Sequence, residues 1–226
     1  MRLALLALGG CAIAEVPPPA PTTLPSARVI YLDDCLPDGC TVSPGDDDSR
    51  TAHSSIVDRP SHLPGFAWGP ERWHELVACV QSAYSPFDIV ITSVDPGEAP
   101  HFEVIVGGSP MDIGLRNGGG AAPLVCPNQL HDNAISFVFA AQGPDLDLLC
   151  WAAVQETGHL LGLDHELDRY DAMTWLSPPT HKAGFQDDDA QCGEFDAPRW
   201  CSCDRPSQNS YRFLMATLGA SMAPPL

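Results

Sequence analysis

Apolar residues recur at helical spacing in three segments of the chain. After Pro70, which suits the first turn of a helix, one apolar face runs at positions i, i+3, i+4, i+7 and i+11 and comprises Trp73, Leu76, Val77, Val80 and Tyr84. Pro86 ends this predicted helix, because proline cannot continue the helical hydrogen-bond ladder. A second helix is predicted after an N-cap at Asp145 or Asp147, with an inward face of Leu148, Leu149, Trp151, Ala152 and Val154. A third is predicted over 209–218, where one face carries Tyr211, Leu214, Met215 and Leu218.

Short runs rich in β-branched and aromatic residues predict strands between these helices. They lie at 28–32, 88–94, 102–106 and 134–139. The stretch 33–68 is full of Asp, Pro, Gly and Ser, so it is predicted to be a loop. The predicted order is strand, helix, three strands, helix, and then a C-terminal helix.

A motif with metal-site spacing lies on the second predicted helix and just beyond it. Residues 155–165 read Q-E-x-x-H-x-x-G-x-x-H, with Gln155, Glu156, His159, Gly162 and His165 at the defining positions. In the zinc-protease motif H-E-x-x-H, two histidines at i and i+4 share a helix face, and the Glu between them is the general base. In the long form of the motif, a Gly turns the chain so that a third His closes the site. The alternative is an ordinary amphipathic helix that ends at Gly162 and carries two solvated histidines.

Together with Asp171-Ala172-Met173-Thr174 downstream, this motif resembles the metzincin clan of zinc endopeptidases. The resemblance implies an α+β fold (α/β/α-like) with a twisted mixed sheet, an active-site helix, a Met-turn and a C-terminal helix. It also implies one catalytic Zn²⁺ held by Gln155, His159 and His165. Glu156 would then be the general base, and Met173 would form the floor of the metal site. The implied partner is a peptide or protein substrate, and we expect a monomer.

The motif departs from the family at Gln155, where the family has its first ligand histidine. The carbonyl oxygen of a Gln side chain is a harder and weaker zinc donor than imidazole, so we expect looser metal binding. The alternative is a catalytically inactive pseudopeptidase that holds an extended peptide in its former cleft by strand addition. Trp175 also stands near the position where the clan often has a Tyr. Of the residues that flank His165, Asp164 is expected to be solvated, and Glu166 either matches an astacin-like position or is simply exposed.

A glycine-rich stretch, Asn117-Gly118-Gly119-Gly120, precedes the motif helix. It is either a plain turn or a wall of the cleft where backbone approaches substrate closely.

The balance of charge excludes one class of partner. The chain has 29 acidic and 11 basic residues and a formal net charge of −18, which repels phosphate backbones, so nucleic-acid binding is not expected. Two runs, Asp46–Asp48 and Asp187–Asp189, are expected to be solvated loops. A Ca²⁺ site built from their carboxylates is the alternative.

The first 14 residues are predicted to be a signal peptide, because Arg2 precedes a short apolar run. Leu8-Gly9-Gly10-Cys11 resembles a bacterial lipobox, which implies lipidation of Cys11, whereas cleavage near Ala14 is the alternative. A Pro-rich tether over 15–26 would then lead to the domain at 27–226. We therefore expect a secreted protein or an envelope lipoprotein, with membrane contact only through the N-terminal lipid.

The cysteines predict a disulfide framework in an exported domain. Of nine cysteines, eight remain once Cys11 is set aside. Cys35 and Cys40 could close a small loop, whereas Cys201 and Cys203 are too close to pair comfortably, so each is expected to bond elsewhere. His131-Asp132 is a candidate for a structural metal site.

Overall fold

A five-stranded mixed sheet lies at the centre of the fold, in the order β5-β1-β6-β8-β7. The computed structural model describes residues 29–124, 126, 132–176 and 184–221. Four strands pair in parallel and are β1 (Val29–Asp33), β5 (Val90–Thr92), β6 (Phe102–Val106) and β8 (Ile135–Val138). The short strand β7 (Gly120–Ala121) runs antiparallel to β8 and forms the sheet edge that lies near α2.

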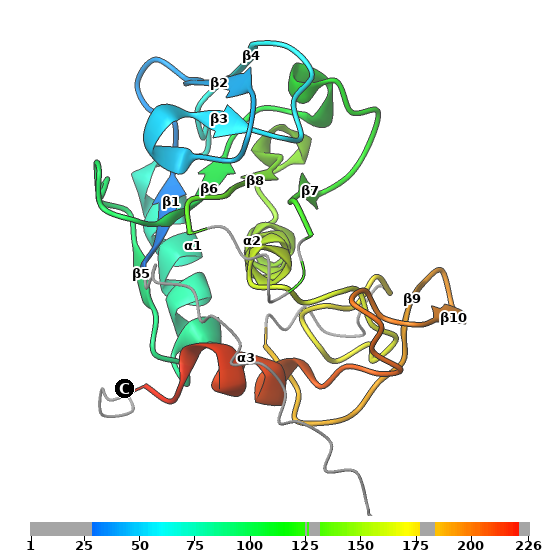
Figure 1. Ribbon diagram of the computed structural model, residues 1–226. Helices are drawn as coiled ribbons and strands as arrows, with labels where there is room; N and C mark the ends of the chain where they lie inside the picture. The colour runs from blue at the N-terminus through cyan, green and yellow to red at the C-terminus, as the bar shows by residue number, and fades with distance from the viewer. Residues whose placement is uncertain (1–28, 125, 127–131, 177–183, 222–226) are drawn as a thin grey trace, which may run out of the picture.

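Two helices cover one face of this sheet (Figure 1). They are α1 (Gly69–Tyr84) and α2 (Leu146–Leu160), and the disulfide Cys79–Cys150 joins them. Side chains alternate along the strands, so Ile30, Val104 and Val138 pack in the core cluster that contains both helices. The predicted apolar face of α1 is confirmed, because Trp73, Leu76, Val77, Val80 and Tyr84 are its buried residues.

A small second sheet covers the opposite face (Figure 1). Its strands are β2 (Cys40–Pro44), β3 (His53–Ser54) and β4 (Ser61–Leu63), in the order β3-β2-β4, with 3-10 turns at Ser49–Thr51 and Pro110–Ile113. The prediction of a loop over 33–68 is therefore wrong for these strands. They are two to five residues long and hold a separate core with Ile105 and Phe137, which no local apolar period reveals.

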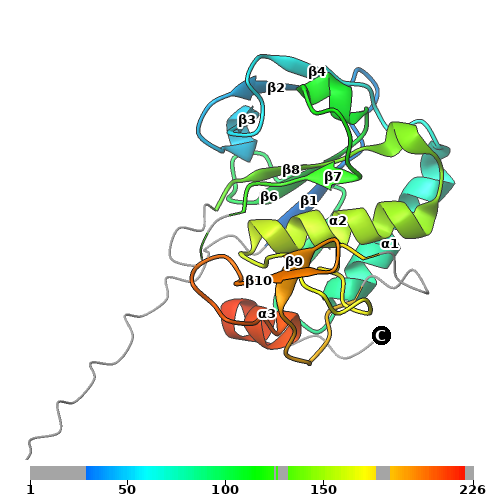
Figure 2. The ribbon, with the colours of Figure 1, turned by 90° about the vertical axis from the view of Figure 1, so that its right-hand side faces the viewer.

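The chain after α2 packs beneath the helices (Figure 2). It contains the hairpin of β9 (Cys192–Glu194) and β10 (Ala197–Arg199) and ends in α3 (Ser210–Leu218). Phe185 and Tyr211 anchor this part by packing against Phe87 at ring-centroid distances of 5.8 and 5.4 Å. The molecule is thus an α+β protein, with α2 between the central sheet and the last 60 or so residues (Figure 2).

Four disulfides cross-link the described residues. The pair Cys35–Cys40 closes the small loop that the sequence predicts, and Cys201 and Cys203 bond elsewhere, as predicted, to Cys192 and Cys126. Such a framework indicates an oxidising, extracellular environment. Within the part of the chain that the structure describes, no helix is long and apolar enough to cross a bilayer. The predicted signal peptide (1–14), tether (15–26), Cys11 and His131 lie outside the described residues.

Candidate metal centre and cleft

The end of α2 brings two histidines of the motif together. Gly162 follows the helix with φ 94°, a left-handed conformation that glycine adopts without strain. Two backbone hydrogen bonds close the turn, from Gly162 N–H to His159 O (2.9 Å) and from Leu163 N–H to Gly158 O (2.9 Å). The chain therefore reverses at Gly162, and His165 returns beside the last helical turn.

The Nε2 atoms of His159 and His165 lie 3.0 Å apart, with the two rings edge to face. The Nδ1 of His159 donates to Leu163 O at 2.8 Å, and the Nδ1 of His165 donates to a Glu194 carboxylate oxygen at 3.2 Å. These acceptors fix the tautomers, so both Nε2 atoms carry lone pairs.

Both imidazoles are neutral near pH 7. Burial and, to a smaller extent, the neighbouring His165 lower the pKa of His159 to about 4. Burial also lowers the pKa of His165, although Glu194 opposes the shift. Two neutral nitrogen lone pairs this close repel each other unless a proton or a cation lies between them. Two Zn–N bonds of about 2.0–2.1 Å at a tetrahedral angle would place the nitrogens about 3.3 Å apart. This donor pair therefore fits a metal ion.

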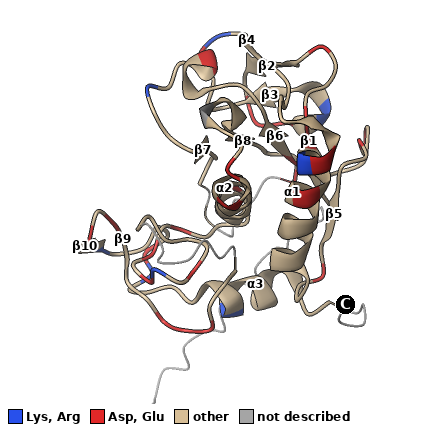
Figure 3. Ribbon diagram, turned by 180° about the vertical axis from the view of Figure 1, so that it is seen from behind, with Lys and Arg blue, Asp and Glu red and all other residues tan. Residues whose placement is uncertain are grey.

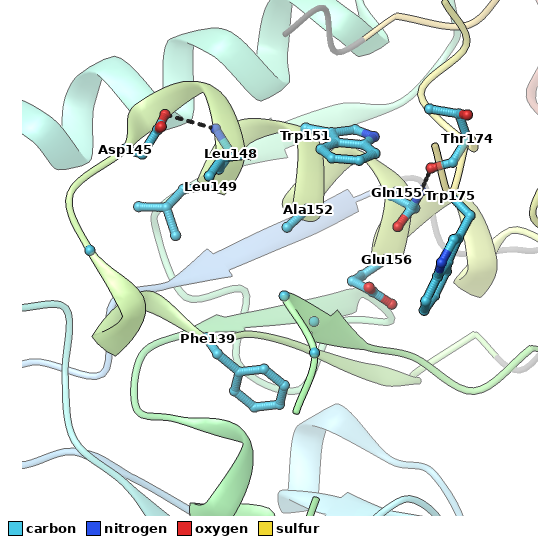
Figure 4. A pocket seen from close by; sticks show the side chains of 14 residues that line it. Phe139, Asp145, Leu148, Leu149, Trp151, Ala152, Gln155, Glu156, Thr174 and Trp175 are labelled. Atoms are coloured by element: carbon cyan, nitrogen blue, oxygen red, sulfur yellow. Dashed lines mark hydrogen bonds between the residues drawn. The ribbon is translucent and has the colours of Figure 1, made fainter. Parts of the chain in front are cut away.

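Glu156 lies beside the histidines and faces the cleft (Figure 4). Its side chain is buried, and burial raises the pKa of this carboxyl to about 8. It packs against β7, where a Cβ on Gly120 would come within 2.6 Å of Glu156 Oε1. A cation at the histidine pair would lower this pKa again, because an opposite charge favours the carboxylate.

Gln155 is engaged in a different way from the histidines. Its side-chain amide donates to the carbonyl oxygens of Ala172 at 3.1 Å and Thr174 at 2.6 Å (Figure 4). Trp151, one turn earlier on α2, donates its indole N–H to the same Ala172 oxygen at 2.9 Å. Gln155 thus ties α2 to the Ala172–Thr174 segment through its nitrogen, and only its carbonyl oxygen is left for a ligand role.

Met173 and Trp175 flank the site from this segment. Met173 is fully buried, and its Sδ lies against Gly158, where a Cβ would collide with it. This places Met173 against the last turn of α2. Trp175 is half-exposed, and its ring packs edge-on against His165 at a centroid distance of 4.9 Å.

A pocket of about 360 Å³ opens next to Glu156 and Gln155 (Figure 4). Its walls come from the glycine stretch, from α2 and from Trp175, and its other lining residues include Phe139, Leu148, Leu149 and Ala152. Gly118, Gly119 and Gly120 all line it, which supports the interpretation of this stretch as a wall of the cleft. An apolar pocket beside a few convergent polar groups is typical of a ligand site.

Residues outside the motif complete the surroundings of His165. Arg199 binds both carboxylate oxygens of Asp164 at 2.6 and 2.7 Å and an oxygen of Glu194 at 2.6 Å. The expectation that Asp164 is solvated is wrong, since its side chain is 1% exposed. Burial alone would raise the pKa of Asp164, but the hydrogen bonds from Arg199 and Ser202 outweigh it and hold the pKa well below its ordinary value.

Glu166 is also fully buried, so it does not stand on the surface as an exposed Glu would. Gln208 donates to one of its oxygens at 3.1 Å, and the other oxygen has no hydrogen-bond partner among the described residues. Burial and, to a smaller extent, the charge of Asp171 raise its pKa to about 9. Glu166 is therefore neutral at pH 7 and forms part of the lower core instead of the cleft.

Two other groups among the described residues have ligand atoms close enough together for a metal, but neither suits one. Cys35 and Cys40, next to Asp33, form a disulfide and so offer no thiolate. Asp164, His165 and Glu194 have the Arg199 guanidinium among them, which already forms ion pairs with both carboxylates. The histidine pair is therefore the better candidate centre.

No family model matches the chain, and no curated protein matches it. We therefore infer the function from the geometry of the site. Acidic residues lie on both the upper layer and the lower loops, whereas basic residues are few (Figure 3).

Proposed function

We propose that this chain is an exported zinc-dependent endopeptidase with a site of the metzincin type. The observation that carries the proposal is the pair of Nε2 lone pairs on His159 and His165, presented to one point beside the buried carboxyl of Glu156. The turn at Gly162 and the buried Met173 below the helix are consistent with that architecture. The oxygen of Gln155 is the third protein ligand in this proposal.

A zinc ion held there would supply a coordinated water with a pKa near 7 and would polarise a peptide carbonyl. Glu156 is placed to accept a proton from the attacking water and to pass it to the leaving amine nitrogen. Burial holds the pKa of this carboxyl at about 8 without a metal, and a zinc ion would lower it toward the range that suits a group that both accepts and donates a proton. Trp175 packs edge-on against the ring of His165.

The substrate we propose is an extended peptide. Among the described residues β7 pairs with β8 alone and forms the sheet edge, so a further strand could pair along its other side. Gly120 of β7 packs against Glu156, so a peptide added along this edge would pass the general base. The apolar pocket beside Glu156 would receive one large apolar side chain of that peptide.

The test combines metal content with cleavage of a quenched fluorescent peptide library. The full chain should bind about one zinc and cleave peptides, and Glu156→Gln should keep the zinc but lose cleavage by at least ~100-fold. Glu75→Gln, an exposed change on α1, is the matched control and should leave both unchanged. Cleavage that survives in Glu156→Gln would overturn the proposed mechanism.

One observation favours a second candidate, a peptide-binding protein without catalysis. The amide of Gln155 is already held by two carbonyl oxygens, an arrangement that serves packing without any metal. A chain that lacks zinc and catalysis but binds extended peptides in the cleft would support this alternative.

A further inference from the structure

The hairpin β9–β10 supplies the polar contacts of His165 that lie outside the motif. Its two strands pair antiparallel, and the disulfide Cys192–Cys201 closes it. Gly193 N–H donates to His165 O at 3.1 Å, so strand β9 of the hairpin lies directly beside His165.

Glu194 connects this hairpin to the imidazole. One of its oxygens accepts from His165 Nδ1 at 3.2 Å and from Arg199 Nη2 at 2.6 Å. The guanidinium of Arg199 donates to both oxygens of Glu194, from Nε at 3.2 Å and from Nη2 at 2.6 Å, which is the pairing of a guanidinium with a carboxylate. The group that faces Nδ1 therefore only accepts. The ring of His165 can then present only Nε2 to the cleft.

Arg199 is in turn held by the buried carboxylate of Asp164. It donates to both oxygens of Asp164, which lies immediately before His165 in the chain. Asp164 is further held by the backbone N–H groups of His165 and Ser202, each at 2.7 Å. The contacts therefore run in a closed circuit from Asp164 through Arg199 and Glu194 to His165.

We propose that Glu194, held by Arg199 on the disulfide-closed hairpin, is a positioning residue that fixes the tautomer and the orientation of the His165 ring. The inference rests on the proposed metal site in one respect, that Nε2 is the atom presented to zinc. A carboxylate on the far nitrogen of a ligand histidine also makes that histidine a stronger donor. This would offset the weaker oxygen donor at Gln155.

The experiment measures two properties of the full chain with its disulfides intact. The first is the tautomer of His165 in the metal-free protein, from the ¹⁵N shifts of the imidazole. The second is zinc affinity, by competition with a chromophoric chelator. The variants are Glu194→Ala and Glu194→Gln, with Glu75→Ala as a matched control, because Glu75 is in an exposed ion pair on α1.

In wild type we expect the proton on Nδ1 of His165. Glu194→Ala should give a tautomer mixture and should weaken zinc binding by about 10–100-fold. Glu194→Gln keeps an acceptor oxygen, so it should restore the Nδ1–H tautomer and most of the affinity. Glu75→Ala should match wild type in both measurements. A merely structural role of Glu194 would lower the melting temperature in both Glu194 variants and leave the tautomer unchanged.

An unchanged tautomer together with wild-type zinc affinity in Glu194→Ala would overturn the inference. If wild type binds no zinc, the proposed function fails instead, and the tautomer of His165 in the two variants still decides the role of Glu194.

Discussion

The Nε2 atoms of His159 and His165 lie 3.0 Å apart, while the Nδ1 atom of each ring donates to a fixed acceptor. Each neutral ring carries one N–H, and that N–H is on Nδ1. A proton on either Nε2 would therefore cost that ring its hydrogen bond from Nδ1. Removing such an acceptor costs about 1–3 kcal/mol, whereas a cation between the rings leaves both contacts in place. This arrangement suits the pair of metal ligands that the proposed function requires.

His159→Ala should abolish stoichiometric zinc binding. The change removes a ligand itself, so the loss of affinity should exceed the ~10–100-fold typical of the groups that only orient a ligand. The measurement is zinc per chain after gel filtration. His74→Ala is the matched control, because His74 is exposed on α1. Zinc retained in His159→Ala would place the metal elsewhere.

Gln155 has two roles that substitution can separate. Its amide nitrogen holds the Ala172–Thr174 segment, and its oxygen is the proposed zinc ligand. In Gln155→Ala, the oxygens of Ala172 and Thr174 lose their amide donor, so the free energy of unfolding should fall by about 1–3 kcal/mol. Gln155→His should lose a similar amount of stability in the metal-free state, yet bind zinc more tightly, because imidazole is the better donor.

Denaturant unfolding with and without zinc measures both effects of the Gln155 changes. Tighter zinc binding in Gln155→His would show that the geometry of the site suits three nitrogen ligands. If Gln155→Ala binds zinc as tightly as wild type, the oxygen of Gln155 is not a ligand, and its role is to hold the Ala172–Thr174 segment.

The sequence predicts the parts of this molecule that repeat over short distances. The apolar faces of α1 and α3 follow a helical period, and the spacing of Gln155 to His165 brings Glu156 and both histidines together, as the motif requires. The strands β5 and β8 are shorter than predicted, because flanking apolar residues continue in loops.

What the sequence could not predict depends on contacts between distant residues. Glu194 and Arg199 lie 29 and 35 residues from the side chains that they bind, with no local pattern to indicate it. The clue that was present is the pair Cys192 and Cys201, which frames both residues in a short loop. Nothing in the sequence around Asp164 indicates that it is buried, because its partner Arg199 is distant in the sequence.

A buried carboxyl pair in the central sheet predicts a pH dependence of stability. Glu103 on β6 shares a hydrogen bond with Asp33 on β1, and burial raises the pKa of Glu103 well above its ordinary value. The folded state therefore keeps a proton that the unfolded state releases above pH ~4.3. The contribution of Glu103 to stability should be greatest below that pH and should fall as the pH rises toward the raised pKa of the folded state.

Glu103→Gln removes this titration and keeps a hydrogen-bond donor toward Asp33. The variant should be more stable than wild type by about 1–3 kcal/mol at pH 7, with the difference vanishing near pH 4. Urea unfolding from pH 4 to 8 measures it, with Glu98→Gln as an exposed control. Parallel pH curves for wild type and Glu103→Gln would contradict the assignment.

The close approach of Gly120 to Glu156 gives the sharpest steric test of the site. A Cβ on Gly120 would lie 2.6 Å from Glu156 Oε1 and 2.7 Å from the backbone oxygen of Phe137, so either β7 or the general base must move. At the neighbouring Gly119 a Cβ would meet only the Cβ of Ala152, at 4.0 Å. Neither glycine has a positive φ, so backbone strain does not separate the two changes.

Gly120→Ala should therefore lower kcat for peptide cleavage by at least ~100-fold, because a misplacement of a catalytic group by about 1 Å can cause a loss of this size. Zinc content should stay at the wild-type level, because the atoms nearest to a Cβ on Gly120 belong to Glu156 and Phe137 and not to the histidines. Gly119→Ala should keep both activity and zinc. Equal activity in the two variants would mean that the carboxyl of Glu156 does not act from the position it occupies against β7. Loss of zinc in Gly120→Ala alone would mean that β7 supports the metal ligands as well as the general base.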